Sequence, residues 1–210
     1  RGDRPAGRTA NETARDGRTR FSPSFPLVDA KLHPPPHRPD TVDRPRLVSR
    51  LRAEPQPRVV AVVAPPGYGK TTTLAEWART DGRDVVWLTV DTFDNDASVF
   101  LSYLAAGMDR IEPIDGSIAT VLSLRGPAVL GAAVPRLASE LHRWPRPGLI
   151  VFDEVHRLVD RTCLDALTLL LENLPPGFRA AIAGRTAPDL PPARFRARRM
   201  PLAIGPNELA

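Results

Sequence analysis

The stretch that decides the fold is Ala64-Pro65-Pro66-Gly67-Tyr68-Gly69-Lys70-Thr71-Thr72. Its spacing is that of a phosphate-binding loop, with Ala64 where the strict pattern has glycine. Gly67 and Gly69 tolerate positive φ angles, which turn successive backbone N–H groups toward a bound phosphate. The whole stretch is therefore predicted to bind nucleotide. The alternative is a plain Gly/Pro turn between a strand and a helix.

The residues on either side favour the first interpretation. Residues 58–63 are a β-branched run suited to a buried parallel strand, and residues 72–79 have a composition that can be helical. Strand, loop and helix thus follow in the order that the motif requires, with a helix N-terminus available to an anion. In this setting we expect Lys70 to contact the β- and γ-phosphates of a nucleotide and the Thr71 hydroxyl to bind Mg²⁺.

A second chemical motif is Gly-Leu-Ile-Val-Phe-Asp-Glu-Val-His at residues 148–156. Four apolar residues running into two carboxylates are expected of a strand that ends beneath the phosphates. We expect Asp153 to hold the hydration shell of Mg²⁺ and Glu154 to orient or deprotonate the attacking water. The alternative is a buried strand ending in a solvated acidic turn. His156, on the following turn, has a structural or a signalling role.

Three more apolar runs, at residues 85–90, 180–183 and 201–204, predict the rest of a sheet. The first run is followed by an acidic cluster, Asp91 to Asp96, which is well placed to touch the site, although Asp94 and Asp96 are better interpreted as helix caps. Together the patterns predict an α/β fold. It is the three-layer αβα sandwich of the P-loop NTPases, with a mainly parallel five-stranded sheet.

The apolar run 180–183 is followed by Gly184 and then Arg185. An arginine at the carboxyl end of a strand can reach the γ-phosphate and report its presence, which is the role of a sensor. The alternative is a salt-bridged surface arginine.

Amphipathic helices are predicted between the strands. Their ranges are residues 42–51 with Pro45 in the first turn, 100–111, two segments within 116–144 that break at Gly126-Pro127 and restart near Pro135, and 164–174. Cys163 precedes the last helix. We interpret it as a small core residue rather than a catalytic thiol, because no Cys/His arrangement accompanies it.

Composition limits the class of protein. With 210 residues, 42% hydrophobic and 25% charged, the chain can bury one substantial core. No apolar run approaches the roughly 18 residues of a membrane helix, so we expect a cytoplasmic protein without a membrane partner. The net charge of +5 lies mainly in residues 1–20. The arginines between 194 and 199 are interpreted as a solvated helix face rather than a nucleic-acid patch.

The chain divides into four expected parts. Residues 1–28 are rich in Arg, Pro and Gly and are expected to be a disordered leader. Residues 29–52 form an N-terminal extension, largely extended at the proline-rich residues 31–40. Residues 53–205 are the P-loop NTPase domain, and residues 206–210 begin a truncated following domain.

The motifs resemble a known family when they are taken in order. They are Lys31-Leu32, Arg38-Pro39-Asp40, Val42 to Leu51, APPGYGKTT, WLTVDTFDND, FLSYL, FDEVH, LPPG, AGRT and IGPNEL. This series is similar to that of the nucleotide-binding module of MalT-like, large ATP-binding regulators of the LuxR family, which belong to the STAND class of signalling P-loop ATPases. The resemblance covers about residues 30–210. Glu154 stands where close relatives have aspartate, a chemically compatible change.

The resemblance implies a switch in which ADP holds an inactive state, while ATP and an unknown small-molecule or protein inducer permit self-association. It also implies that Val42, Arg44 and Leu47 help to hold the base and sugar. The inducer and the DNA would be bound by domains that these residues do not include, the DNA by a C-terminal one.

We therefore expect an ATP/ADP-binding switch module that hydrolyses ATP slowly. One alternative is a P-loop small-molecule kinase in which residues 91–147 form the acceptor site and lid. Another is a non-catalytic interaction fragment that binds nucleotide weakly.

Overall fold

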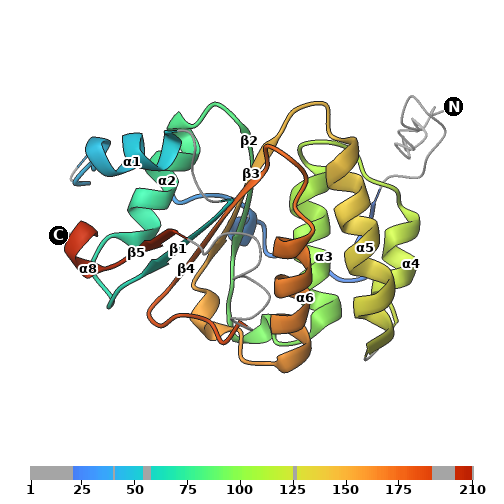
Figure 1. Cartoon of the computed structure of the whole chain (residues 1–210). Helices are drawn as coiled ribbons and strands as arrows, with labels where there is room; N and C mark the ends of the chain where they lie inside the picture. The colour runs from blue at the N-terminus through green and yellow to red at the C-terminus, as the bar shows by residue number, and fades with distance from the viewer. Residues whose placement is uncertain (1–20, 40, 54–57, 125–126, 191–201, 210) are drawn as a thin grey trace, which may run out of the picture.

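The computed structural model describes residues 21–39, 41–53, 58–124, 127–190 and 202–209. A five-stranded sheet lies between two layers of helices, which confirms the predicted αβα sandwich (Figure 1). The strands are β1 (Val59–Val63), β2 (Asp84–Thr89), β3 (Gly148–Asp153), β4 (Arg179–Gly184) and β5 (Leu202–Ile204). The α-helices are α1 (Pro45–Arg52), α2 (Lys70–Thr80), α3 (Ala97–Asp109), α4 (Ser117–Leu122), α5 (Pro127–Arg143), α6 (Arg161–Glu172) and α8 (Pro206–Leu209). The described ranges also contain the short 3₁₀ helices η1 (Asp29–Leu32), η2 (Thr92–Asp94) and η3 (Val155–Arg157).

The strand order is β2-β3-β4-β1-β5, and every pairing is parallel. The five apolar runs of the sequence all become strands, with small shifts at their ends. In register, Val63 at the end of β1 lies opposite Gly184 at the end of β4, and Thr89 of β2 lies opposite Asp153 of β3. Because the strands are parallel, their carboxyl ends meet at one edge, where ligands bind in this architecture. The two predicted motifs and Arg185 are therefore brought to the same edge.

Two hydrophobic cores fill the space between the layers. Helices α3, α4, α5 and α6 cover one face of the sheet, while α1, α2 and α8 lie on the other (Figure 1). Neighbouring residues of β3 divide between the cores, since Phe152 packs with the first set and Val151 with the second. Both faces of the sheet are therefore covered, and this explains why its strands read as continuous apolar runs rather than alternating ones.

The helix predictions hold with two corrections. The predicted helix 42–51 begins only at Pro45, the first helical residue, so that Val42 lies outside it and is 70% exposed. The predicted restart near Pro135 is wrong, because α5 runs without a break through this residue. Val134 and Leu137 are both buried on either side of the proline. Packing of this continuous apolar stripe outweighs the loss of one backbone hydrogen bond.

The segment before η1 differs from the expected leader. Phe21 is buried in the larger core, and the ring of Phe25 meets the ring of Tyr103 on α3 at a centroid distance of 6.1 Å. The backbone N–H of Val28 donates to the Tyr103 hydroxyl at 3.2 Å. Residues 21–28 are therefore packed rather than disordered, and Lys31 and Leu32 are helical rather than extended.

Some predictions fall on residues that are not described. They are the leader as far as residue 20 and the arginine cluster between residues 194 and 199. Within the described ranges, every helix is too short or too polar to cross a lipid bilayer.

Candidate functional site

The loop between β1 and α2 has the backbone expected of a phosphate-binding loop. Gly67 and Gly69 have φ angles of 85° and 74°, in the region that favours glycine. The N–H of Ala64 donates to the carbonyl of Gly184 at 3.3 Å, which fixes the start of the loop to the end of β4. Helix α2 begins at Lys70, so its unpaired N-terminal N–H groups lie directly after the loop. This arrangement can bind an anion.

Lys70 is buried against the loop rather than extended into solvent. Its ammonium group donates to the carbonyl of Ala64 at 2.8 Å and to that of Pro65 at 3.0 Å. The side chain thus turns back along the loop from the first residue of α2. Its positive charge therefore lies on the inner side of the loop, where a phosphate would bind.

The two sequence motifs meet at Thr71 and Asp153. The Thr71 hydroxyl donates to Oδ2 of Asp153 at 2.7 Å, and the other carboxylate oxygen accepts from the N–H of Glu154 at 2.9 Å. Asp153 is buried, and burial raises the pKa of its carboxyl, although both hydrogen bonds act in the opposite direction. A hydroxyl and a carboxylate are thus placed side by side at the foot of α2.

Glu154 has a strained backbone. Its φ of 58° makes it the one residue other than glycine with positive φ in the described part of the chain. Strain of this kind costs about 1–3 kcal/mol and is common at functional sites. Its carboxylate lies 3.5 Å from Nε of Arg157 and 3.7 Å from Nε2 of His156, and the side chain is partly exposed. The partly exposed carboxylate of Glu154 is thus accessible to a ligand, and it directly follows the buried carboxylate of Asp153.

His156 lies near the Glu154 carboxylate, and Arg185 lies close enough to His156 to affect its pKa. A side-chain carbon placed on Gly184 would come within 3.2 Å of the His156 backbone nitrogen, so the turn after β3 packs on the end of β4. Burial lowers the pKa of His156, and the nearby charge of Arg185 acts in the same direction. Arg185 itself is exposed, next to the same strand end. It is available to a bound ligand.

Arg44 connects three parts of the site. Its backbone N–H donates to Oε2 of Glu76 on α2 at 2.8 Å, and its guanidinium donates to the carbonyl of Leu209 on α8 at 2.9 and 2.6 Å. The guanidinium also contacts Gly69 of the loop. Two further residues were expected on the base side. Val42 is exposed and contributes to no described contact with the loop, and Leu47 is buried in the smaller core.

A groove of about 640 Å³ runs beside the first turns of α2. One wall is the proline-rich segment 34–38 with Thr41 and Asp43, and the other includes Thr71, Thr72 and Glu76. Thr41 and Asp43 flank Val42, which is not among the lining residues. The groove therefore joins the phosphate-binding loop to the segment expected to hold the base and sugar.

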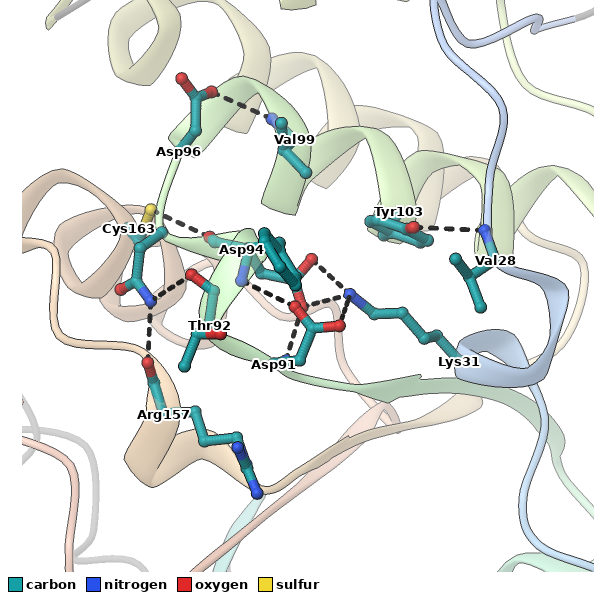
Figure 2. Close-up of polar contacts among 12 residues, drawn as sticks. Val28, Lys31, Asp91, Thr92, Asp94, Asp96, Val99, Tyr103, Arg157 and Cys163 are labelled. Atoms are coloured by element: carbon teal, nitrogen blue, oxygen red, sulfur yellow. Dashed lines mark hydrogen bonds and ion pairs between the residues drawn. The ribbon is translucent and has the colours of Figure 1, made fainter.

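Sequence reasoning missed a buried ionic cluster beside the site. The ammonium of Lys31 lies 2.5 Å from Oδ1 of Asp94 and 3.1 Å from Oδ2 of Asp91, with its charge 4.1 Å from the centre of the Tyr103 ring (Figure 2). Asp94 is fully buried. Its side chain also accepts from the N–H of Asp91, which in turn caps η2. Capping was expected for Asp94 and Asp96, but the burial and the lysine partner were not.

Two other residues near the site were missed. Glu76 is buried and holds the backbone of Arg44, and Asn95 bonds to the turn that follows Glu154. Asn95 could have been found from the sequence, because it lies in the acidic stretch FDND that follows β2. Glu76 gave none, because a glutamate in a helix is ordinarily exposed.

Comparison with known proteins gives a consistent result. A family model described as an AAA domain matches residues 53–185. The chain is 31% identical over 185 residues to the HTH-type transcriptional regulator MalT of Cronobacter sakazakii, a match that covers 88% of this chain and 20% of that protein. MalT of Klebsiella pneumoniae gives the same identity and coverage. The chain thus spans about a fifth of the length of these relatives.

Among solved structures, the chain is similar to a Signal Transduction ATPase with Numerous Domains (STAND) protein with a tetratricopeptide repeat sensor from Pyrococcus horikoshii. The TM-score is 0.50 at 14% identity, and the match covers 81% of this chain and 24% of that one. At this identity the likeness concerns the fold.

Proposed function

The chain belongs to the AAA domain family and is an NTPase module related to MalT, and from this premise we propose that it is a switch that binds ATP and ADP with Mg²⁺ and hydrolyses ATP slowly. The relation to MalT-like regulators that its motifs suggested is confirmed, and membership of this family implies nucleotide binding. One observation carries the proposal. The Thr71 hydroxyl lies 2.7 Å from the Asp153 carboxylate, directly beside the buried Lys70.

The phosphates would lie in the loop from Ala64 to Thr72. The positive φ angles of Gly67 and Gly69, the N-terminus of α2 and the charge of Lys70 all favour an anion at this place. Lys70 would exchange its contacts with the loop carbonyls for phosphate oxygens. Because its ammonium already lies inside the loop, little side-chain freedom would be lost on binding.

The donor set at Thr71 and Asp153 fits Mg²⁺, which prefers oxygen ligands. Among the described residues no group of three or more His, Cys, Asp and Glu side chains could hold a metal ion. The ion would therefore take its other ligands from phosphates and water, as Mg²⁺ commonly does. When bound, it would neutralise charge on the phosphate oxygens.

Glu154 would orient the attacking water and accept its proton, and Arg185 would sense the γ-phosphate. Support comes from the placement of both residues at the carboxyl edge of the sheet, where Glu154 follows β3 and Arg185 follows β4. Glu154 is partly exposed, and Arg185 is exposed. Both side chains are thus accessible to a nucleotide in the loop.

The groove beside α2 would hold the base and sugar. Arg44 would contribute from its place against Gly69, and Val42 from the exposed segment between Thr41 and Asp43. We divide the chain accordingly into an N-terminal extension that forms one wall, the NTPase domain, and a following domain that begins near α8. An inducer, a DNA site and ATP-dependent self-association would belong to the whole regulator, as the name of the MalT relatives suggests for DNA.

A kinase would need an acceptor site in residues 91–147. These residues form η2, α3, α4 and α5, of which α3 packs on β2 while α4 and α5 pack on neighbouring helices. None of the described residues in this range lines the groove beside the loop. The packing therefore favours the switch over the kinase.

The proposal is tested by isothermal titration with ADP and ATP, and by phosphate release without any acceptor. Lys70→Ala should abolish binding of both nucleotides, because the charge on the phosphates is lost. Glu154→Gln should bind both nucleotides and release phosphate more slowly. Arg136→Ala, which removes an exposed arginine of α5 far from the loop, is the control. Unchanged ATP affinity in the Lys70 variant would show that the loop does not hold the phosphates.

A further inference from the structure

Asn95 uses every hydrogen-bonding group of its side chain. Its amide N–H groups donate to the carbonyl of Thr92 at 3.1 Å and to that of Arg157 at 2.9 Å. Its Oδ1 accepts from the N–H groups of Val159 at 2.7 Å and Asp160 at 2.9 Å. Three of the four bonds therefore reach the backbone of a single turn, 62 to 65 residues away in the sequence.

That turn connects Glu154 to helix α6. It begins with the strained backbone of Glu154, continues through η3, and ends at Asp160, whose carboxylate caps α6 by accepting from the N–H of Cys163. The Glu154 carboxylate lies 3.5 Å from Nε of Arg157. The carbonyl of Arg157 is one of the groups that Asn95 holds. Asn95 thus fixes the residue against which the Glu154 side chain rests.

Asn95 is itself held rigidly. It follows η2, which is closed at its start by the reciprocal bonds between Asp91 and Asp94. Lys31 binds both carboxylates from below the helix α3 (Figure 2), and the thiol of Cys163 contacts the carbonyl of Asp94 at 3.5 Å. The backbone that carries Asn95 is therefore held in place by these contacts, and its amide reaches the turn from a fixed position.

From this geometry we propose that Asn95 is a positioning residue for Glu154. It holds the turn at Arg157, Val159 and Asp160, and so maintains the backbone strain and the side-chain direction of Glu154. The inference rests on the proposed function, in which Glu154 orients water. None of the described contacts of Asn95 is with the phosphate-binding loop. Its substitution should therefore slow hydrolysis and leave nucleotide binding unchanged.

Asparagine is required here by its chemistry. The side chain donates to two carbonyls and accepts from two N–H groups, and among short side chains only the amide of asparagine presents two donors together with an acceptor oxygen that has two lone pairs. Asn95→Asp would keep the acceptor for Val159 and Asp160 but lose both donors, and it would set a negative charge beside the carbonyl of Arg157. Asn95→Ala would lose all four bonds.

The test compares the steady-state kinetics of ATP hydrolysis and the affinity for ADP in the unsubstituted 210-residue chain, Asn95→Ala, Glu154→Gln and the double variant. Misplacing a catalytic group by about 1 Å can cost about a hundredfold in rate, so kcat of Asn95→Ala should fall by about ten- to a hundredfold. KM and ADP affinity should not change. The double variant should be no slower than Glu154→Gln alone, because Asn95 acts through Glu154.

Asn173→Ala is the matched control. Asn173 also donates its amide to a backbone carbonyl, that of Leu169, but at the other end of α6. This variant should keep its rate. Amide hydrogen exchange should be faster at residues 155–160 in Asn95→Ala and unchanged there in Asn173→Ala. If Asn95→Ala does not fold, Asn95→Asp provides the same comparison.

The outcomes separate the two proposals. Hydrolysis that depends on Glu154 but not on Asn95, or a double variant in which the two losses multiply, overturns the role of Asn95 alone. Equal losses in Asn95→Ala and Asn173→Ala also overturn it, because they indicate general destabilisation. Hydrolysis that is unaffected by Glu154→Gln overturns the proposed role of Glu154, and that of Asn95 with it.

Discussion

The guanidinium of Arg44 lies against the backbone of Gly69, so closely that a side-chain carbon on Gly69 would come within 2.7 Å of Nη1. The same guanidinium holds the carbonyl of Leu209 on α8. The Arg44 side chain therefore contacts both the phosphate-binding loop and α8, the last described helix. Position 69 favours glycine because of its positive φ, and a side chain there would also displace the end of the Arg44 side chain.

The first prediction compares two glycines of the loop. Both have positive φ, but a carbon on Gly67 would meet nothing within 4 Å. Gly67→Ala should lower the free energy of unfolding by about 1–2 kcal/mol, the cost of a left-handed conformation, and Gly69→Ala should lower it further. In an Arg44→Ala background the difference between the two variants should vanish. Urea unfolding of the nucleotide-free chain measures this, and a difference that persists would mean that Arg44 is not its cause.

The second prediction concerns Mg²⁺. Thr71→Val and Asp153→Asn should each weaken Mg²⁺ binding in the presence of ATP by at least about tenfold, because the first removes the hydroxyl and the second removes the negative charge of the carboxylate. Thr71→Ser keeps the hydroxyl and serves as the control. Titration of ATP with and without EDTA measures the effect. An ATP affinity that depends on Mg²⁺ equally in all four proteins would place the ion elsewhere.

The third prediction concerns the ionic cluster beneath η2. Lys31→Met leaves the fully buried Asp94 without its cation and should cost about 3–5 kcal/mol of unfolding free energy near neutral pH. Asp94→Asn in the same background should restore part of the loss. Urea unfolding of the two single variants and the double variant provides the cycle. If the two losses simply add, the pair is not coupled.

The pH dependence of Lys31→Met follows from burial, which raises the pKa of Asp94. A carboxyl whose pKa is higher in the folded state than in the unfolded state binds its proton more tightly when folded. The defect should therefore be greatest above the raised pKa. It should diminish as the pH falls through that value toward the ordinary aspartate pKa of about 4. A defect that grows with acidification would contradict this.

The fourth prediction concerns Cys163. Burial raises the pKa of its thiol far above the ordinary value, and the neighbouring Asp160 acts in the same direction. The folded chain should therefore react slowly with a thiolate-specific disulfide reagent at pH 8, and the denatured chain should release one equivalent at once, since the sequence has a single cysteine. Rapid reaction of the folded chain would show that Cys163 is accessible.

Local patterns predicted most of the fold because the central strands β3 and β4 are buried on both faces. A run such as residues 148–153 is apolar at nearly every position, which marks it as a strand of a parallel sheet without knowledge of its partners. Since parallel strands end at a common edge, the meeting of Thr71 with Asp153 also followed from the sequence. Helix α5 was harder. A restart was predicted near Pro135, but the packing of the apolar stripe around this proline keeps the helix continuous.

The ionic cluster and the Asn95 contacts could not be predicted in this way. Lys31 and Asp94 lie in irregular or 3₁₀ segments 63 residues apart, where no periodicity indicates which side chains will be buried. An isolated lysine or aspartate is ordinarily assigned to the surface. Only the packing of η1 beside β2 removes both from water, and this depends on the whole sheet.

The strand order has a consequence for synthesis of the chain. β1 leads into the phosphate-binding loop, but both of its neighbours, β4 and β5, are made after residue 178. While the ribosome is still producing the intervening helices, β1 has two unpaired edges, and pairing over such a long separation is slow. The phosphate-binding loop is therefore synthesised long before the strands that flank β1 in the folded sheet. A nucleotide bound in this loop would thus stabilise the chain only after β4 and β5 have emerged.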